Sequence, residues 1–279
     1  MTHAIVTAPD TSLQAAMARA TAIDPDGWYG GAVGPAPEGT VTIARLAAEP
    51  GRLDVLSDLV ATANGYGLRD VAAGFVWGDL VYRVLAAPLV CAAVDGIAPV
   101  TGPSSVAITF GDTGASVGVT FTEMRHLTLH PDASPEAVHC ADRGALVAAL
   151  REQFTRTLGP LVPVLSPRVR RSERVLWLEA CDIAATLLTH VGEKIGRGET
   201  LRAFADALLD GTGPLPGRSR WLPFTHAGIT CTHHLRHSCC RYYAVGPAPC
   251  GTCPLRSAEQ RAERFREWNE RRAAELAAR

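Results

Sequence analysis

Four cysteines near the C-terminal end of the sequence constrain the fold more than any other feature. Cys239 and Cys240 are adjacent, and Cys250 and Cys253 follow after a loop that contains glycine and proline. The Cys250-x2-Cys253 spacing lets one tight turn present two thiols to a metal, and the loop can fold the adjacent pair back toward it. Four thiolates suit either a tetrahedral zinc ion or a [2Fe–2S] cluster. The segment therefore predicts a metal centre whose ligands are Cys239, Cys240, Cys250 and Cys253.

The adjacent cysteines favour the iron–sulfur cluster over zinc. Structural zinc sites usually combine two short chelates, each with a few residues between its ligands. Neighbouring side chains on an extended chain point to opposite sides, and a centre with two irons accommodates such divergence better than one ion. Zinc stays open as the alternative. Cys231, or His234 with His237, could also be ligands, but with four cysteines present neither is needed.

Composition and charge narrow the class of protein. The chain has 27 Lys and Arg against 28 Asp and Glu, a net charge of −1, without the basic excess typical of nucleic-acid partners. The start of the sequence lacks the pattern of a signal peptide, and the longest apolar stretch, residues 84–94, falls short of the ~20 residues of an integral membrane segment. We therefore expect a cytoplasmic protein with reduced cysteines. Cys91, Cys140 and Cys181 have apolar or helical surroundings and should pack in the core.

The hydrophobic pattern predicts an α+β, helix-rich fold with a small antiparallel sheet. Val106, Ile108 and Phe110 alternate with small or polar residues, as do residues 117–121, and the Gly-Asp-Thr-Gly segment at 111–114 between them predicts a hairpin. Residues 40–43 and 127–129 could add strands to that sheet. The segments with helical spacing or caps are residues 11–23, 53–63, 68–94, 142–158, 172–192, 200–209 and 258–279.

Proline, glycine and capping residues predict where these helices begin and end. Asp10 or Thr11 should cap the first helix, and Pro88 should bend or break the helix over residues 68–94. Pro160 and Pro163 should stop the helix that begins at Asp142, and the next helix should run from residue 172 to 192. Residues 26–39 are expected to be loop, and residues 221–255 show no regular period. The last helix is highly charged and should be largely solvated.

The length of 279 residues allows one or two domains, and the elements divide the chain into three regions. Residues 1–130 form an N-terminal α+β region with the hairpin. Residues 131–222 form a helical region. Residues 223–279 form the iron–sulfur-binding segment and the C-terminal helix.

The cysteine segment resembles the C-terminal signature of the FhuF-type ferric-siderophore reductase family. The shared features are the Cys239-Cys240 pair, an intervening loop and Cys250-x2-Cys253 followed by proline. Residues 235–238 (Leu-Arg-His-Ser) and 241–243 (Arg-Tyr-Tyr) are similar to the flanks of the family motif, while the loop over residues 241–249 is one residue shorter than usual. The clear similarity is confined to the C-terminal part of the chain. It implies that the four cysteines hold a [2Fe–2S] cluster.

The resemblance also implies an activity. A cytoplasmic iron–sulfur oxidoreductase would transfer one electron to a ferric siderophore and release Fe(II) for iron acquisition. Since the sequence has no G-x-G-x-x-G or Walker motif, the electrons should come from an external donor such as a ferredoxin or a flavin reductase. The flanking Arg236, Arg241, His233, His234 and His237 could raise the cluster potential or steer an anionic chelate, or could be solvated side chains that balance the charge of the cluster.

Other functions stay open. The chain could be a non-catalytic siderophore-binding or sensor protein with a structural iron–sulfur or zinc site. It could also be a remnant of an aerobactin-synthetase-like fold with acyl-transfer chemistry. Ser116 matches the hydrolase pattern G-x-S-x-G but lies in the predicted hairpin, whereas that motif needs a helix after the serine. Glu123, His126 and His130 could meet on a strand face as metal ligands, although an ordinary half-exposed strand is the simpler interpretation.

Overall fold

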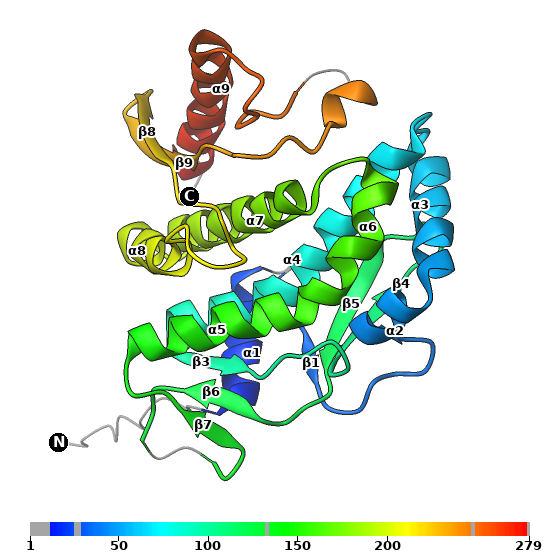
Figure 1. Cartoon of the computed structure of the whole chain (residues 1–279). Helices are drawn as coiled ribbons and strands as arrows, with labels where there is room; N and C mark the ends of the chain where they lie inside the picture. The colour runs from blue at the N-terminus through cyan, green and yellow to red at the C-terminus, as the bar shows by residue number, and fades with distance from the viewer. Residues whose placement is uncertain (1–11, 25–28, 132–133, 247–248, 278–279) are drawn as a thin grey trace, which may run out of the picture.

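The structure is a computed structural model that describes residues 12–24, 29–131, 134–246 and 249–277 (Figure 1). It is 55% helical with 15% strand, and its sheets are small, so the predicted α+β, helix-rich fold is confirmed. The helices before the cysteine segment are α1 (Leu13–Ile23), α2 (Ile43–Ala48), α3 (Pro50–Asn64), α4 (Arg69–Asp95), α5 (Arg143–Leu158), α6 (Val162–Val169), α7 (Glu173–Lys194) and α8 (Gly198–Leu208). The strands in the same part are β1 (Ala32–Val33), β2 (Val41–Thr42), β3 (Ile97–Pro99), β4 (Val106–Phe110), β5 (Ser116–Phe121), β6 (His126–Thr128) and β7 (Ala137–His139).

Helix α4 lies at the centre of the fold because it is apolar around most of its circumference. Helices α1, α3, α5, α6 and α7 pack around it, and so do β3 and β5. Trp77 and Leu80 of α4 and Phe121 of β5 are fully buried there. By length and composition α4 and α7 could each cross a membrane, but 78% and 67% of their apolar stretches are buried in the protein. Packing in the core therefore accounts for their composition.

One buried apolar cluster extends from Leu13 to Leu215. It includes side chains from both of the first two predicted regions, and Cys91, Cys140 and Cys181 lie within it, as predicted. The division at residues 130 and 222 stays a prediction about the organisation of the chain.

The predicted hairpin is confirmed, and one of the two added strands is placed differently. Strands β4 and β5 pair antiparallel with Val106 opposite Phe121, and β2 pairs with β4 as expected. β1, inside the stretch predicted to be loop, pairs parallel with β5. The prediction for residues 127–129 was wrong about the sheet, since β6 pairs with β3 and β7 in a separate sheet. A short strand pattern shows that a strand forms but does not specify its partner.

Prolines interrupt the helices less than predicted. Helix α4 continues through Pro88, which is buried within it. Asp142 caps α5, and the helix ends at Leu158, as predicted. Pro160 and Pro163 lie in the first turns of the following 3-10 segment (Gly159–Leu161) and of α6, where the missing N–H of proline costs nothing.

Two other predicted helix boundaries also differ. Ser12 caps α1 through a hydrogen bond from Ala15 N–H, while Asp10 and Thr11 lie outside the described residues. Gly192, predicted to end α7, lies inside the helix. A Cβ there would come within 2.8 Å of Gly198 Cα, so the glycine lets the start of α8 pack directly on α7.

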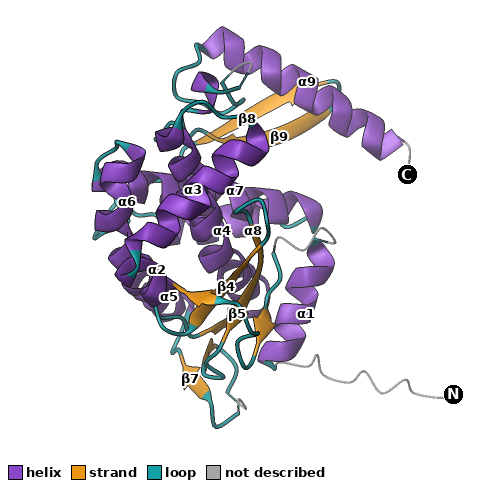
Figure 2. Cartoon of the chain, turned by 90° about the vertical axis from the view of Figure 1, so that its right-hand side faces the viewer, coloured by secondary structure: helices purple, strands orange, loops and turns teal. Residues whose placement is uncertain are grey.

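The cysteine segment belongs to a small C-terminal unit that packs on α7 (Figures 1 and 2). Strands β8 (Trp221–His226) and β9 (Ile229–His234) form an antiparallel hairpin, and helix α9 (Ala258–Ala277) packs on it. The sequence pattern missed the hairpin because most of its side chains are only partly buried. The prediction of a largely solvated last helix is confirmed, since most described residues of α9 are exposed, while Phe265 and Asn269 are buried.

Asn269 should hold α9 on the hairpin. Its amide donates hydrogen bonds to the carbonyl oxygens of Phe224 (3.0 Å) and Ile229 (2.9 Å) in β8 and β9. Asn269→Ala leaves both carbonyls without this donor, and we expect the free energy of unfolding to fall by about 1–3 kcal/mol in urea titrations. The exposed Glu263 on the same helix provides the control, and Glu263→Ala should change stability little. Equal stabilities of the two variants would contradict the proposed role of Asn269.

Candidate metal centre

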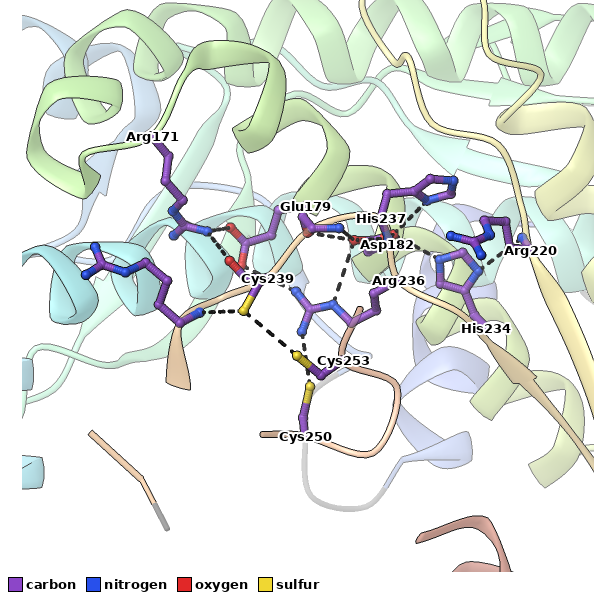
Figure 3. A network of polar contacts seen from close by, with 12 residues as sticks. Arg171, Glu179, Asp182, Arg220, His234, Arg236, His237, Cys239, Cys250 and Cys253 are labelled. Carbon is purple, nitrogen blue, oxygen red and sulfur yellow. Dashed lines mark hydrogen bonds and ion pairs between the residues drawn. The ribbon is translucent and has the colours of Figure 1, made fainter. Parts of the chain in front are cut away.

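Asp182 of α7 holds the chain that leads from β9 into the cysteine segment (Figure 3). Its carboxylate accepts hydrogen bonds from the backbone N–H groups of His237 (2.9 Å) and Ser238 (2.8 Å) and from the Ser238 hydroxyl (2.6 Å). His234 Nε2 lies 3.0 Å from the same carboxylate. Burial opposes its ionisation, but the hydrogen bonds from His234, His237 and Ser238 outweigh burial and hold the pKa of Asp182 below its usual range. The segment is therefore fixed directly before Cys239.

The four cysteine sulfurs form two pairs. Cys239 Sγ lies 3.9 Å from Cys253 Sγ, and Cys240 and Cys250 are neighbours whose thiols influence each other's pKa. Two thiolates bound to one tetrahedral metal at ~2.3 Å would lie roughly 3.8 Å apart, which agrees with the first pair. All four cysteines are among the described residues, and no three of their sulfurs lie within 4.8 Å of one another. Each pair joins one of the adjacent cysteines to one from the Cys-x2-Cys turn.

Several N–H groups are directed at the sulfurs. The backbone N–H of Arg241 donates to Cys239 Sγ at 3.3 Å. Arg241 has a φ of 62°, in the left-handed region, at the turn that follows the adjacent cysteines. The neighbouring Cys250 thiol and the charge of Arg236 lower the pKa of Cys240, although burial opposes this, and the same contact with Cys240 raises the pKa of Cys250. The thiolate is the form that binds a metal.

Arg236 connects the sulfurs to two buried carboxylates (Figure 3). Its Nη1 lies 4.0 Å from Cys250 Sγ, its Nη2 3.6 Å from Glu179 Oε1, and its Nε 3.7 Å from Asp182 Oδ2. Arg171 donates to Glu179 at 3.0 Å and to the carbonyl oxygen of Cys239 at 3.0 Å. Two guanidinium groups thus face two carboxyl groups beside the thiols. Burial raises the pKa of Glu179, against the attraction of both arginines.

The segment after the adjacent cysteines is tied to α4. The Arg241 side chain donates to the Asp70 carboxylate at 2.5 Å, and the ring of Tyr242 packs edge-on against Phe75, with 6.0 Å between centroids. Asp70 is in the first turn of α4 and Phe75 is one turn further on. Helices α4 and α7 therefore hold the cysteine segment from two sides.

A cavity of ≈ 530 Å³ opens between α4, α7 and the cysteine segment. Its wall is mostly apolar, and Cys240 and Cys250 contribute to it directly. Gly78 leaves space in this wall, since a Cβ built there meets no atom within 4 Å, whereas a Cβ at Gly74 would come within 2.5 Å of Arg171 Nη2. The other lining residues are Phe75, Asp79, Tyr82, Glu179, Asp182, Ile183, Thr186, Arg236 and Thr252.

The remaining candidate ligands from the sequence lie apart from the sulfurs or have other partners. Cys231 is buried in β9, and its electrostatic neighbours are Glu193 and Arg272, not the four cysteines. His234 and His237 face Asp182. Of the five flanking residues predicted to carry positive charge, Arg236 reaches a sulfur with its side chain, while Arg241 does so through its backbone N–H.

The two weaker motifs do not form sites among the described residues. Ser116 lies at the start of β5, in the hairpin as predicted, and its hydroxyl bonds with Asp79 and Arg83 at 2.7 Å each. His130 Nε2 lies 2.7 Å from the carbonyl oxygen of Asp95, and His126 is buried in β6. With Glu123 they make no metal-binding group in the described part of the chain.

Sequence reasoning missed Glu179 and Asp182, although a signal was present. Both are ionisable residues in the middle of an otherwise apolar stretch of α7. They are three positions apart, so they lie on the same face of the helix. Buried carboxylates on an apolar helix need polar partners, and several of the partners of Glu179 and Asp182 lie in the chain just before Cys239.

Comparison with known proteins adds no assignment: no protein-family model matches the chain, and no curated protein matches it.

The residues present fit an iron–sulfur cluster. Four thiols converge, Cys239 beside Cys253 and Cys240 beside Cys250, and the Arg241 N–H and the Arg236 guanidinium are directed toward them. A single zinc ion would need all four sulfurs at similar mutual distances of roughly 3.8 Å, whereas two pairs suit two metal ions. Cys239, Cys240, Cys250 and Cys253 stay the predicted ligands.

The role of Asp182 can be tested by its effect on stability. Asp182→Asn removes a buried charge that four groups surround, and we expect the free energy of unfolding at pH 7 to fall by about 3 kcal/mol. Because the pKa of Asp182 is lowered in the folded state, its contribution is complete above about pH 5 and is lost as the pH falls through the folded pKa.

The difference between wild type and variant should therefore shrink in acid. Urea titrations at several pH values measure it, with the exposed Asp112→Asn as the control. A difference that stays constant down to about pH 2 would show that folding does not lower the pKa of Asp182.

Proposed function

We propose that the chain binds a [2Fe–2S] cluster and reduces ferric siderophores by one electron at a time. The observation that carries the proposal is the pairing of the four sulfurs, Cys239 with Cys253 and Cys240 with Cys250. Each pair would hold one iron. The resemblance of the cysteine segment to the FhuF-type reductases supplies the substrate class.

The pairing follows from the local chain geometry. Adjacent side chains diverge, so Cys239 and Cys240 are directed to different partners. Within the turn, the N–H of Cys253 donates to the carbonyl oxygen of Cys250 at 3.1 Å, which brings the two remaining thiols to one side of the segment. A single ion would require the two pairs to merge, which means moving the backbone that Asp182 and Arg171 hold.

When bound, the cluster would accept and donate one electron near neutral pH. The chain's own residues would tune that potential. The N–H group of Arg241 and the guanidinium of Arg236 stabilise negative charge on sulfur, which raises the potential. The carboxyl groups of Glu179 and Asp182 act in the opposite direction.

The ≈ 530 Å³ cavity would receive the ferric chelate. It falls within the usual range for small-molecule sites, and it brings a ligand against Cys240 and Cys250. Fe(III) in a siderophore is held by hard oxygen donors, and gaining one electron gives Fe(II), which those donors hold less tightly. The chain then needs only to dock the chelate beside the electron donor, because no bond in the siderophore has to break.

The alternatives make different use of the same features. A siderophore-binding or sensor protein would bind the siderophore in the cavity without reducing it. A structural zinc site would bind the same four thiols, but the protein would then lack visible absorption. The aerobactin-synthetase-like alternative would need a nucleotide or acyl site, and we find no feature of the described residues that favours it.

The cluster can be tested on the purified protein. We expect a reddish protein whose visible absorption is bleached by dithionite and restored by a ferric siderophore. Ser in place of each of Cys239, Cys240, Cys250 and Cys253 should abolish or greatly weaken that absorption. Cys231→Ser is the matched control and should keep it. A colourless wild-type protein with one bound zinc would contradict the proposed reductase function.

The docking cavity can be tested separately from the cluster. Gly78→Leu places a side chain in open space within the cavity wall, and leucine is a better helix former than glycine. We expect normal cluster absorption and dithionite bleaching, but reoxidation by ferric siderophore slowed about tenfold or more. The control is Gly51→Leu in α3, where the added side chain also meets open space but lies outside the cavity. Unchanged reoxidation in Gly78→Leu would mean that the chelate docks elsewhere.

A further inference from the structure

A second cleft lies on the other side of the cysteine segment, between α7 and α9. Two adjoining cavities of ≈ 220 and ≈ 350 Å³ make it up, and they share His190, Glu193, Trp268 and Arg271 in their walls. Together they are large enough for a small-molecule ligand. Both cavities are separate from the cavity proposed to dock the ferric chelate. Thr186 and Thr252 line the smaller of the two and the docking cavity as well.

The walls of this cleft are aromatic rings in stacked pairs. His233 stacks on Phe265 with 3.8 Å between ring centroids and 3° between planes. His190 stacks on Trp268 with 5.9 Å between centroids and 16° between planes. Trp268 remains 39% exposed, so part of its indole ring is open to a ligand. Such surfaces bind flat aromatic rings by stacking.

One buried polar group in the wall lacks a partner. His233 is only 9% exposed, and its Nε2 has no hydrogen-bond partner among the described residues. The neighbouring His234 has its Nε2 on Asp182. A buried imidazole nitrogen without a partner is costly, and a ring edge with a donor or acceptor group would satisfy it.

The mouth of the cleft carries a cation suited to an anionic group. Arg271 has no carboxylate partner among the described residues, and its guanidinium lies 6.0 Å from the Trp268 ring centroid. The other charged groups nearby already have charged neighbours. Lys194 binds Asp24 at 3.1 Å, Arg272 binds Glu275 at 3.2 Å, and the charges of Arg272 and Arg202 act on Glu193 against burial, which raises its pKa.

The inner end of the cleft reaches the cysteine segment. Gly251 and Thr252, the two residues between Cys250 and Cys253, line it. Gly251 does not have a positive φ, and a Cβ there would have only an ordinary contact, 3.8 Å, with Arg264. A ligand in the cleft therefore comes within one residue of two predicted ligands of the cluster.

We propose that the cleft between α7 and α9 binds a flat heterocycle that carries a phosphate, specifically flavin mononucleotide. The ring would stack on Trp268 with its edge toward His233, and the phosphate would meet Arg271. The site thus offers the indole of Trp268 for stacking, the unpaired Nε2 of His233 for a polar group on the edge of the flavin ring, and the guanidinium of Arg271 for the phosphate.

The role of this ligand as electron donor rests on the proposed function. Reduced flavin mononucleotide releases two electrons in succession and two protons to water as it becomes oxidised flavin. Two ferric chelates would be reduced to the Fe(II) state for each flavin oxidised, so electrons and charge balance. An external flavin reductase would supply the reduced flavin.

Binding can be measured without any turnover. Titration of the full chain into flavin mononucleotide should quench flavin fluorescence, because the ring stacks on an indole. Trp268→Ala should weaken binding about tenfold. Arg271→Gln should weaken it by a similar factor, since a charge-assisted bond to the phosphate is lost, but should leave the weaker binding of riboflavin, which lacks the phosphate, unchanged. The control is Arg266→Gln, the same change at an exposed position of α9 outside the cleft, which should have no effect.

The outcomes separate this site from the cluster. If Trp268→Ala and Arg271→Gln both weaken flavin binding, the cleft is the flavin site. This conclusion holds even if the protein shows no iron–sulfur absorption, an outcome that would contradict only the proposed reductase function. No binding to the wild type below about 1 mM, or binding that Trp268→Ala and Arg271→Gln leave unchanged, would overturn the proposal for the cleft, whatever the cluster result.

Discussion

The candidate centre depends on one buried carboxylate. Asp182 is 1% exposed, and a charge so buried is tolerated only when its lone pairs are satisfied. Its partners are two backbone N–H groups, a hydroxyl and two imidazoles, all from residues 234–238. The fixed charge in α7 therefore determines the path of the chain before Cys239. Without it, the adjacent cysteines would keep the contacts of Arg171 and of Asp70 but lose those before Cys239, and loop entropy would oppose the approach of the second pair more strongly.

Asp182 belongs to a polar stripe on α7 that organises both cavities. Glu179, Asp182, Thr186, His190 and Glu193 recur at intervals of three and four residues, so they lie on one face of a helix that is otherwise apolar. The first two face the sulfurs, Thr186 lines both cavities, and the last two line the cleft beside α9. The apolar residues of α7 pack in the core. One helix thus gives the fold its stability on one side and the candidate sites their polar groups on the other.

Local sequence patterns predicted the parts of this protein that local interactions determine. The cysteine segment, the β4–β5 hairpin and the cap at Asp142 all follow from neighbours in the chain. What failed depended on distant contacts. The sheet of β6 is set by β3 and β7, and the β8–β9 hairpin was missed because its half-exposed strands leave a weak pattern. The polar stripe of α7 was readable as a pattern, but its partners lie more than fifty residues away in sequence.

The two cavities have a consequence for electron transfer if both proposals hold. The ferric chelate would contact Cys240 and Cys250, while the flavin would contact Gly251 and Thr252 on the opposite side of the same turn. Thr186 and Thr252 line both cavities. The turn that carries Cys250 and Cys253 would lie between the flavin and the chelate. Reduced flavin gives up two electrons and each ferric chelate takes one, so a one-electron centre in that turn would divide the transfer into single steps.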